Sequence, residues 1–258
     1  MLNSAKTLKD YSLKSLDGEI GKVKDFYFDD HYWQVQYLVV DTGNWIVSSK
    51  VLIAINSIRS VDHEKECINI DLTKEQIENS PSLDSEKPVS KQYQKKLTTY
   101  YGLPAYWENL QPIGVGMYAI AGVAPLPLSD AKVEKLDASK AAAEVWDPNL
   151  RSLNHVSDYA IQSKDDKNSY IDDFMIDDTT WQIRYLVNDP HAWLPGNKFL
   201  LSTQWIESIS WKQSTVFVSV TSDMIKDSPA YDGKMMIDRD FEIKLHAYYD
   251  KKGYWTMA

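Results

Sequence analysis

Length, composition and charge narrow the class of protein. The chain has 258 residues, 43% of them hydrophobic, and its net charge is −9 at pH 7. Such an acidic chain lacks the basic surface that attracts a phosphate backbone or an anionic membrane, so we expect no nucleic-acid partner. Cys67 is the only cysteine, which excludes an intramolecular disulfide and a cysteine-based zinc site.

Short strands are predicted along the first part of the chain. Residues 23–28 and 33–40 are strand-like and flank the turn-forming sequence Asp-Asp-His-Tyr. In the second strand Trp33, Val35, Tyr37 and Val39 share one face, which we expect to be buried. Further strands are predicted at residues 51–55, 58–61 and 67–72. This density of short strands favours a small barrel or sandwich.

Two helices are predicted after these strands. Thr73 can cap the first helix, because Gln76 stands three residues later and can reach back to the cap, and Pro81 ends it. The second helix is predicted at residues 90–101, with an apolar stripe that packs on the barrel. The stripe is formed by Tyr93, Leu97 and Tyr100, and in the second half of the chain by Phe241, Leu245 and Tyr248.

The sequence matches itself when it is shifted by 148 residues. The run DFYFDDHYWQVQYLVVD begins at Asp25, and the run DFMIDDTTWQIRYLVND begins at Asp173. The register holds without a gap, and 32 of the 106 positions from 2 to 107 are identical. A period this long indicates a duplicated domain rather than a solenoid.

We therefore predict two lobes joined by a linker. The first lobe is residues 1–112 and the second is residues 148–258, each ending in a helical segment. Residues 113–147 are rich in Ala, Gly and Pro, as is typical of a linker, with one short helix predicted at residues 132–145. We expect the linker to couple the lobes weakly, so that each lobe melts by itself.

The chain has no segment typical of an exported or membrane-spanning protein. Residues 1–12 contain no apolar core of the kind that signal peptides carry. The longest weakly polar stretch, residues 113–128, is interrupted by Pro125 and Pro127 and is shorter than the ~20 residues that cross a bilayer. We therefore expect a cytoplasmic protein without a transmembrane segment.

Three segments of the first lobe resemble the signature of the PRC-barrel family. They are DGEIGKVKDFYFDD at residues 17–30, WQVQYLVVDTGNW at residues 33–45 and KVLI at residues 50–53, and much of the signature returns in register in the second lobe. The resemblance is closest to stand-alone bacterial proteins with two PRC-barrels in tandem. It implies a mainly β fold with short helices, made of two small barrels, and a role in binding or assembly without known catalysis.

PRC-barrels also occur in the cytoplasmic part of the H subunit of the photosynthetic reaction centre and in the tail of a ribosome-maturation factor. The resemblance therefore extends to a role like that of the H subunit, although that subunit has a membrane helix that we do not expect here. The acidic charge of the chain argues against the RNA-linked role of the ribosome factor.

Two acidic pairs and five histidines are the residues that could carry chemistry. Asp29-Asp30 and Asp177-Asp178 could bind a metal or handle protons, but we interpret them as hairpin-turn residues that accept backbone hydrogen bonds. The chain has no EF-hand spacing and no HExxH, GxSxG, P-loop or GxGxxG sequence, and no two histidines share a matched position. We predict no catalytic, cofactor-binding or metal-binding residue.

Aromatic residues gather at the end of each lobe. Because Tyr and Trp are typical anchors at protein interfaces, these residues are our candidates for contact with a partner, another subunit or the other lobe. They could instead cover one end of each barrel or stack on a small molecule. The candidates are Tyr100, Tyr101, Tyr106, Trp107, Tyr248, Tyr249, Tyr254 and Trp255.

Together these features predict a non-enzymatic binding or assembly module with a protein partner, a second copy of the chain being one option. The alternative is a small-molecule sensor or an enzyme with a site between the lobes. A deep pocket with converging polar groups would favour the alternative, and a flat aromatic patch would favour the binding module.

Overall fold

A computed structural model describes residues 1–43, 50–81, 89, 91–102, 149–165, 168–190 and 197–256. The chain divides into two compact units, one made of Met1–Leu83 with Asn149–Ala258 and the other made of Asp84–Pro148. Within the first unit, we call residues 2–81 the N-terminal lobe and residues 149–256 the C-terminal lobe. The predicted boundaries at residues 112 and 147, and the helix predicted at residues 132–145, lie outside the described residues.

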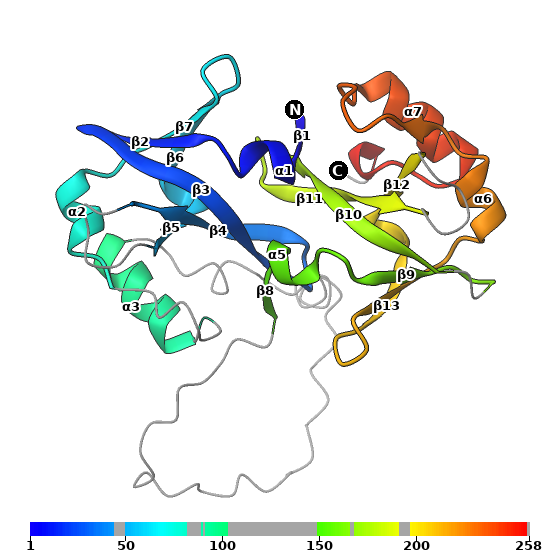
Figure 1. Ribbon diagram of the computed structural model, residues 1–258, viewed down its shortest axis with the longest axis horizontal. Helices are drawn as coiled ribbons and strands as arrows, with labels where there is room; N and C mark the ends of the chain where they lie inside the picture. Colours follow the sequence, from blue (N-terminus) through cyan, green and yellow to red (C-terminus); the bar gives the residue numbers. More distant parts are fainter. Residues whose placement is uncertain are drawn as a thin grey trace, which may run out of the picture. The chain divides into compact units, whose positions relative to one another are not determined.

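Both lobes are mainly β with short helices, and their elements follow in the same order at the offset of the sequence repeat (Figure 1). The N-terminal lobe contains β1 (Leu2–Ser4), α1 (Ala5–Leu8), β2 (Ser12–Ser15), β3 (Gly18–Asp29), β4 (Gln34–Asp41), β5 (Lys50–Ala54), η1 (Ile55–Ser57), β6 (Ile58–Asp62), β7 (Cys67–Ile70) and α2 (Lys74–Glu78). The C-terminal lobe contains β8 (Leu150–Ser152), α5 (Leu153–Val156), β9 (Ala160–Gln162), β10 (Asn168–Asp177), β11 (Gln182–Asp189), β12 (Lys198–Ser202), η2 (Thr203–Trp205), β13 (Ile206–Ser210), β14 (Thr215–Val218), α6 (Ser222–Lys226), β15 (Ala230–Tyr231), α7 (Arg239–Tyr248) and η3 (Tyr254–Thr256).

The strands of each lobe pair along the same path, and this path does not close. It runs β5-β4-β3-β2-β7-β6 in the N-terminal lobe and β12-β11-β10-β9-β14-β13 in the C-terminal lobe. In the described residues, the end strands β5 and β6 do not pair with each other, and neither do β12 and β13. A three-residue 3-10 helix, η1 or η2, connects the two end strands of each lobe. Because these end strands do not pair, the sheet of each lobe is open, which departs from the predicted barrels.

The two lobes exchange their first strands. β1 pairs antiparallel with β10, and β8 pairs antiparallel with β3. A further bridge joins Gln34 on β4 to Gln182 on β11, so that the paired strands form one 15-stranded sheet. In Figure 1, α1 and α5 lie where the lobes meet. Backbone hydrogen bonds thus join the lobes directly, which corrects the expectation of weak coupling.

The core of each lobe contains the residues expected there, but β4 is buried on both faces. Trp33, Tyr37, Trp181 and Tyr185 are buried, as predicted. Every residue of β4 between its two ends is also buried, so the period-two pattern revealed only one of two covered faces. The strand begins at Gln34, because Trp33 has a φ of 55° and Trp181 a φ of 58°, which places both in the turns that precede β4 and β11.

The cap predicted for the first helix is confirmed at α2. Thr73 Oγ1 accepts a hydrogen bond from Gln76 N (3.2 Å), and Gln76 Oε1 accepts one from Thr73 N (2.8 Å). These two bonds satisfy backbone N–H groups that a helix start otherwise leaves unpaired.

The buried stripe of α7 differs from the predicted one. Phe241 is half-buried and Tyr248 is 40% exposed. The prediction is wrong because two ionisable side chains are buried on this helix, and hydrophobic periodicity assigns such residues to solvent. The buried residues of α7 are Glu242, Leu245 and His246, and Tyr249, which follows the helix at its C-cap, is buried as well.

The second unit is described mainly over α3 (Lys91–Tyr101). Gln94, Leu97 and Thr98 are buried on this helix, whereas Tyr100 is 41% exposed. Tyr100 therefore does not belong to a buried stripe. Of the three residues predicted for this stripe, only Leu97 is fully buried.

Candidate functional site

The contact between the lobes, which we call the seam, is held by two buried carboxylates. Asp25 on β3 accepts hydrogen bonds from Ser152 Oγ (2.5 Å) and Asn154 N (3.1 Å) at the start of α5. Asp173 on β10 accepts the matched bonds from Ser4 Oγ and from a backbone N–H of α1 (3.1 Å). Burial raises the pKa of both carboxyls, and the hydrogen bonds that they accept oppose this rise.

The turns that precede β4 and β11 meet across the seam. Val35 N donates to Trp181 O (2.9 Å), and Ile183 N donates to Trp33 O (2.7 Å). Gln182 Nε2 also donates to Trp33 O (3.1 Å) and to the carbonyl of the preceding residue. The backbone of each turn is therefore fixed by the other lobe.

The interpretation of the acidic pairs as turn residues is confirmed for the first acid of each pair by its hydrogen bonds. Asp29 Oδ1 accepts backbone N–H bonds from His31 (3.0 Å) and Tyr32 (3.1 Å). Asp177 Oδ1 accepts the matched bond from Thr179 N (3.1 Å). Each carboxylate thus closes the turn that follows it.

The second acid of each pair bonds across the seam to a different cation or donor. Asp30 pairs with Arg151 Nε (2.8 Å), whose guanidinium lies 4.2 Å from the ring centre of Trp211. Asp178 instead pairs with His63 Nε2 (2.6 Å). Trp211 and His63 occupy matched positions, so the repeat preserves the location of this contact and changes its chemistry.

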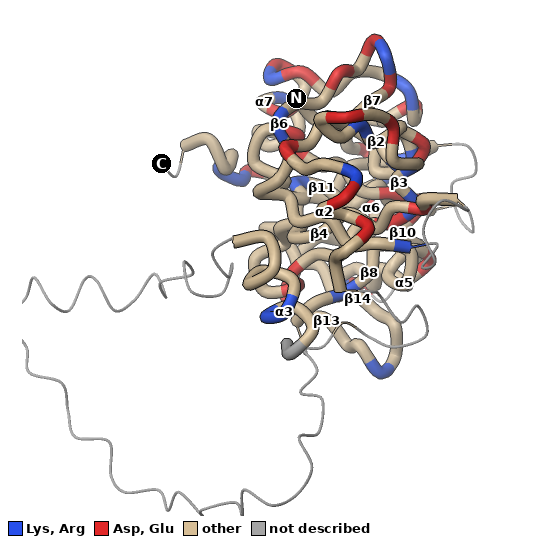
Figure 2. Tube along the Cα trace, turned by 90° about the vertical axis from the view of Figure 1, so that its left-hand side faces the viewer, with Lys and Arg blue, Asp and Glu red and all other residues tan. Residues whose placement is uncertain are grey.

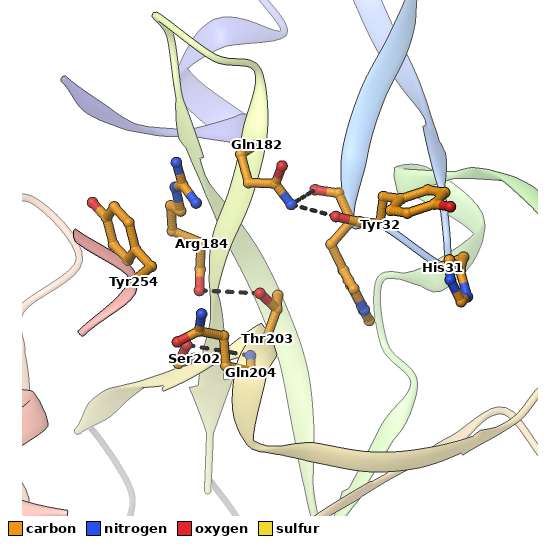
Figure 3. A pocket seen from close by; sticks show the side chains of 9 residues that line it. His31, Tyr32, Gln182, Arg184, Ser202, Thr203, Gln204 and Tyr254 are labelled. Atoms are coloured by element: carbon orange, nitrogen blue, oxygen red, sulfur yellow. Dashed lines mark hydrogen bonds between the residues drawn. The ribbon is translucent and has the colours of Figure 1, made fainter. Parts of the chain in front are cut away.

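A pocket of about 310 Å³ opens at the seam. The N-terminal lobe contributes the turn before β4, and the C-terminal lobe contributes β11, the junction of β12 with η2, and η3 (Figure 3). The lining carries hydroxyl, amide, imidazole and guanidinium groups but no carboxylate. The lining residues are His31, Tyr32, Trp33, Gln182, Arg184, Ser202, Thr203, Gln204 and Tyr254.

Arg184 brings a permanent positive charge to this lining. Its Nη2 donates to Asp177 Oδ2 (3.3 Å) and to Thr180 Oγ1 (3.4 Å), and its guanidinium lies 3.9 Å from the ring centre of Tyr254. Burial raises the pKa of Asp177, but the bonds from Thr180 and Thr179 and the charge of Arg184 outweigh burial and hold this pKa below its usual value. Asp177 therefore stays ionised and orients Arg184.

Behind Tyr254, a buried polar network joins β11 to α7. Tyr185 Oη donates to Glu242 Oε1 (2.8 Å) and lies 3.0 Å from His246 Nε2, and Arg239 pairs with Glu242 Oε2 (3.0 Å). Burial lowers the pKa of His246, and burial together with Glu242 raises the pKa of Tyr254 to about 12. At neutral pH the imidazole is therefore uncharged.

Sequence reasoning missed both the pocket and this network. The pocket lining comes from four separate segments of the chain, and no local pattern joins them. The network does leave a signal, because Glu242 and His246 stand four residues apart on one face of a helix, next to Leu245.

The predicted aromatic contacts fall into three groups. Tyr249, Tyr254 and Trp255 contact other residues of the C-terminal lobe, since Trp205 lies 4.4 Å from Tyr249 and His246 lies 5.0 Å from Trp255, between ring centres. Tyr248 and Tyr100 have exposed rings, and Tyr101 is half-buried beside Tyr100. Tyr106 and Trp107 lie outside the described residues. As contacts with a partner, all eight residues stay a prediction.

Charges of both signs are interspersed along the described trace (Figure 2). Cys67 is buried with a free thiol. Within the described ranges, no three His, Cys, Asp or Glu side chains are grouped so that they could hold a metal ion.

In the part of the chain that the structure describes, no helix combines the length and the apolar character needed to cross a membrane.

Comparison with known protein families finds a PRC-barrel domain at residues 13–77, which spans β2 to α2 apart from the first and last residues of this segment. None of the curated proteins that were compared with the chain matches it.

Proposed function

We propose that the chain is a non-enzymatic binding and assembly module made of two PRC-barrel-like lobes. The PRC-barrel domain at residues 13–77 supports this for the N-terminal lobe, because such domains often serve binding or assembly. The matching order and pairing of the strands support the same domain type in the C-terminal lobe. The seam carries the proposal, because the exchange of β1 and β8 makes the two lobes one body with a fixed outer surface.

The partner that we propose is a protein in the cytoplasm, a second copy of the chain included, and not a nucleic acid. The resemblance to the H subunit of the reaction centre supports a role in assembling a protein complex. We assign the contact to the outer side of α7, where Ile243 and Tyr248 are exposed. Lys95 stands at the position matched to Ile243, so a helix in this repeat does not require an apolar residue there.

Affinity capture from a lysate of the native cell tests this assignment. The full chain is compared with Ile243→Lys, which installs the matched residue Lys95, and with Tyr170→Lys, which installs the matched residue Lys22 at another exposed aromatic position. We expect the same protein to be retained by the wild type and by Tyr170→Lys and lost with Ile243→Lys. Equal retention by all three would reject α7 as the contact, and no retention by the wild type would reject the assembly function.

The pocket supports a second function, the sensing of a small molecule. Polar groups from both lobes converge on it, and a ligand held there would contact the turn before β4 and the strand β11 together. We propose that the site binds its ligand without chemistry. A ligand that raises the melting temperature and also changes the capture of the protein partner would support this function. A ligand that raises the melting temperature but leaves the capture of the protein partner unchanged would reject this function.

A further inference from the structure

We propose that the pocket at the seam binds a small molecule that carries a carboxylate next to a flat apolar part. The proposal rests on the sensing function and names the chemical class of its ligand. It follows from the hydrogen bonds that Arg184 leaves unmade, from the residues at the matched positions of the other lobe, and from the rings that line the pocket.

Arg184 brings a charge with spare hydrogen-bonding capacity to the pocket. Its hydrogen bonds to described residues all leave from Nη2, at 3.3 Å and 3.4 Å, which is long for a charged donor. Its Nε is buried without a hydrogen-bond partner among the described residues. Asp177, the carboxylate that faces it, does not line the pocket and already accepts bonds from Thr179 and Thr180. A guanidinium satisfied this weakly favours an additional acceptor.

The guanidinium is also held in a fixed orientation. It stacks on Tyr254 at 3.9 Å, and Arg239 lies 5.1 Å from the centre of the same ring. A planar guanidinium with a fixed plane suits a planar acceptor such as a carboxylate, because two parallel N–H groups can meet two oxygens. In Figure 3, Arg184 and Tyr254 lie on one side of the pocket and Tyr32 lies on the other.

The fold does not require these polar residues. At the positions matched to Arg184, Ser202 and Thr203, the N-terminal lobe has Gln36, Ala54 and Ile55. Gln36 and Ala54 are buried in strands that pair as β11 and β12 do. One lobe thus folds with neutral or apolar residues where the other has a cation and two hydroxyls. In the C-terminal lobe Ser202 caps η2 and Thr203 bonds the backbone of β11, but the fold of the repeat does not depend on these groups, which leaves them open to selection for a ligand.

The rest of the lining suits a flat apolar group. Tyr32 brings a ring from the N-terminal lobe, and the bonds from Gln182 to the carbonyl oxygens of Tyr32 and Trp33 fix the turn that carries it. A volume of about 310 Å³ is at the small end of ligand sites, which limits the ligand to roughly one ring and one carboxylate.

Binding of benzoate, compared with benzamide, tests the proposal on the full chain. The two probes share a shape, and only benzoate is charged at neutral pH. Titration followed by NMR through the Nε–Hε signal of Arg184, which is identified by its loss in Arg184→Gln, reports on the pocket itself. We expect saturable binding of benzoate that is about ten- to hundredfold tighter than that of benzamide, as a charged hydrogen bond gives.

Three variants complete the test. Arg184→Gln installs the matched residue Gln36 and should weaken benzoate binding, measured by calorimetry, to the level of benzamide. Arg184→Lys keeps the charge without the planar fork and should bind with intermediate affinity. Arg59→Gln makes the same change at an exposed arginine of β6 and should bind as the wild type does.

The failures of the two proposals are distinguishable. Equal affinity for benzoate and benzamide, or unchanged benzoate binding by Arg184→Gln, would overturn the carboxylate class and leave the sensing function standing. A wild-type chain that binds neither probe would overturn the ligand class, and the sensing function would then rest on the capture experiment. Benzoate binding that leaves partner capture unchanged would confirm the ligand class and reject the sensing function.

Discussion

His246 shows how one buried side chain makes the stability of the molecule depend on pH. Burial lowers its pKa, and the charge of Arg239 acts in the same direction, so the folded chain holds the imidazole neutral below the usual value of about 6.5. The unfolded chain therefore binds more protons in that range. Stability is fully present above pH ~6.5 and falls as the pH decreases through the unfolded and then the folded pKa.

We expect His246→Thr, which installs the matched residue Thr98, to flatten this decline. Urea unfolding at several pH values between 7.5 and 5 measures it, and the free energy of unfolding of the variant should change less than that of the wild type. His31→Thr, which makes the same substitution at an exposed residue, is the control and should keep the wild-type slope. Equal slopes in all three proteins would show that the fold does not lower the pKa of His246.

At the scale of elements, Asp25 holds the beginning of α5 to the other lobe. Asp25→Ala removes the acceptor of three donors, namely Ser152 Oγ, Asn154 N and Phe26 N. Of these donors only Phe26 N is fully buried. A buried donor left unpaired costs about 1–3 kcal/mol and a partly buried one costs less, so we expect the free energy of unfolding to fall by about 2–4 kcal/mol. Asp25→Asn keeps one acceptor oxygen and removes a buried charge, so its loss should be much smaller.

Equilibrium unfolding of the two variants at neutral pH compares these effects. Asp173→Ala and Asp173→Asn provide the matched pair, because Asp173 accepts the equivalent bonds in the other direction across the seam. A loss of stability that is the same for Ala and Asn would mean that the charge of the carboxylate, and not its hydrogen bonds, holds the exchanged elements.

At the scale of the whole molecule, the seam should make the two lobes unfold together. Trp33 stacks on Phe28 at 5.2 Å, Phe28 lies 6.5 Å from Phe174 of the other lobe, and Trp181 lies 6.4 Å from Phe26, between ring centres. Removing one ring therefore disturbs both cores. The expectation that each lobe melts by itself, which assumed weak coupling through a linker, is replaced by a single shared transition.

Trp33→Ala should lower the stability of this shared transition by about 3–5 kcal/mol, the usual cost of a large cavity. Calorimetry of the full chain is the measurement, with Trp181→Ala as the matched variant, and both thermograms should show one shifted peak for the two lobes. Two separate peaks, one at the wild-type temperature, would mean that the lobes are independent.

Local signals in the sequence determined a large part of this fold. The offset of 148 residues, the strands around residues 23–40 and their matched partners, the cap at Thr73 and the burial of Trp33, Tyr37, Trp181 and Tyr185 were all readable. These features depend on side-chain periodicity and on groups a few residues apart, which a linear pattern contains.

Tertiary structure alone decided the rest. The exchange of β1 and β8 and the meeting of the two lobes at the pocket around Arg184 depend on contacts between residues that are more than a hundred positions apart. The open path of the strands depends on pairings within a lobe such as that of β2 with β7, about 55 positions away. The burial of Glu242 and His246 depends on Tyr185 and Arg239, which satisfy polar atoms that hydrophobic periodicity assigns to solvent. Sequence determines which faces are apolar, but only the folded chain determines which polar groups find partners and can therefore be buried.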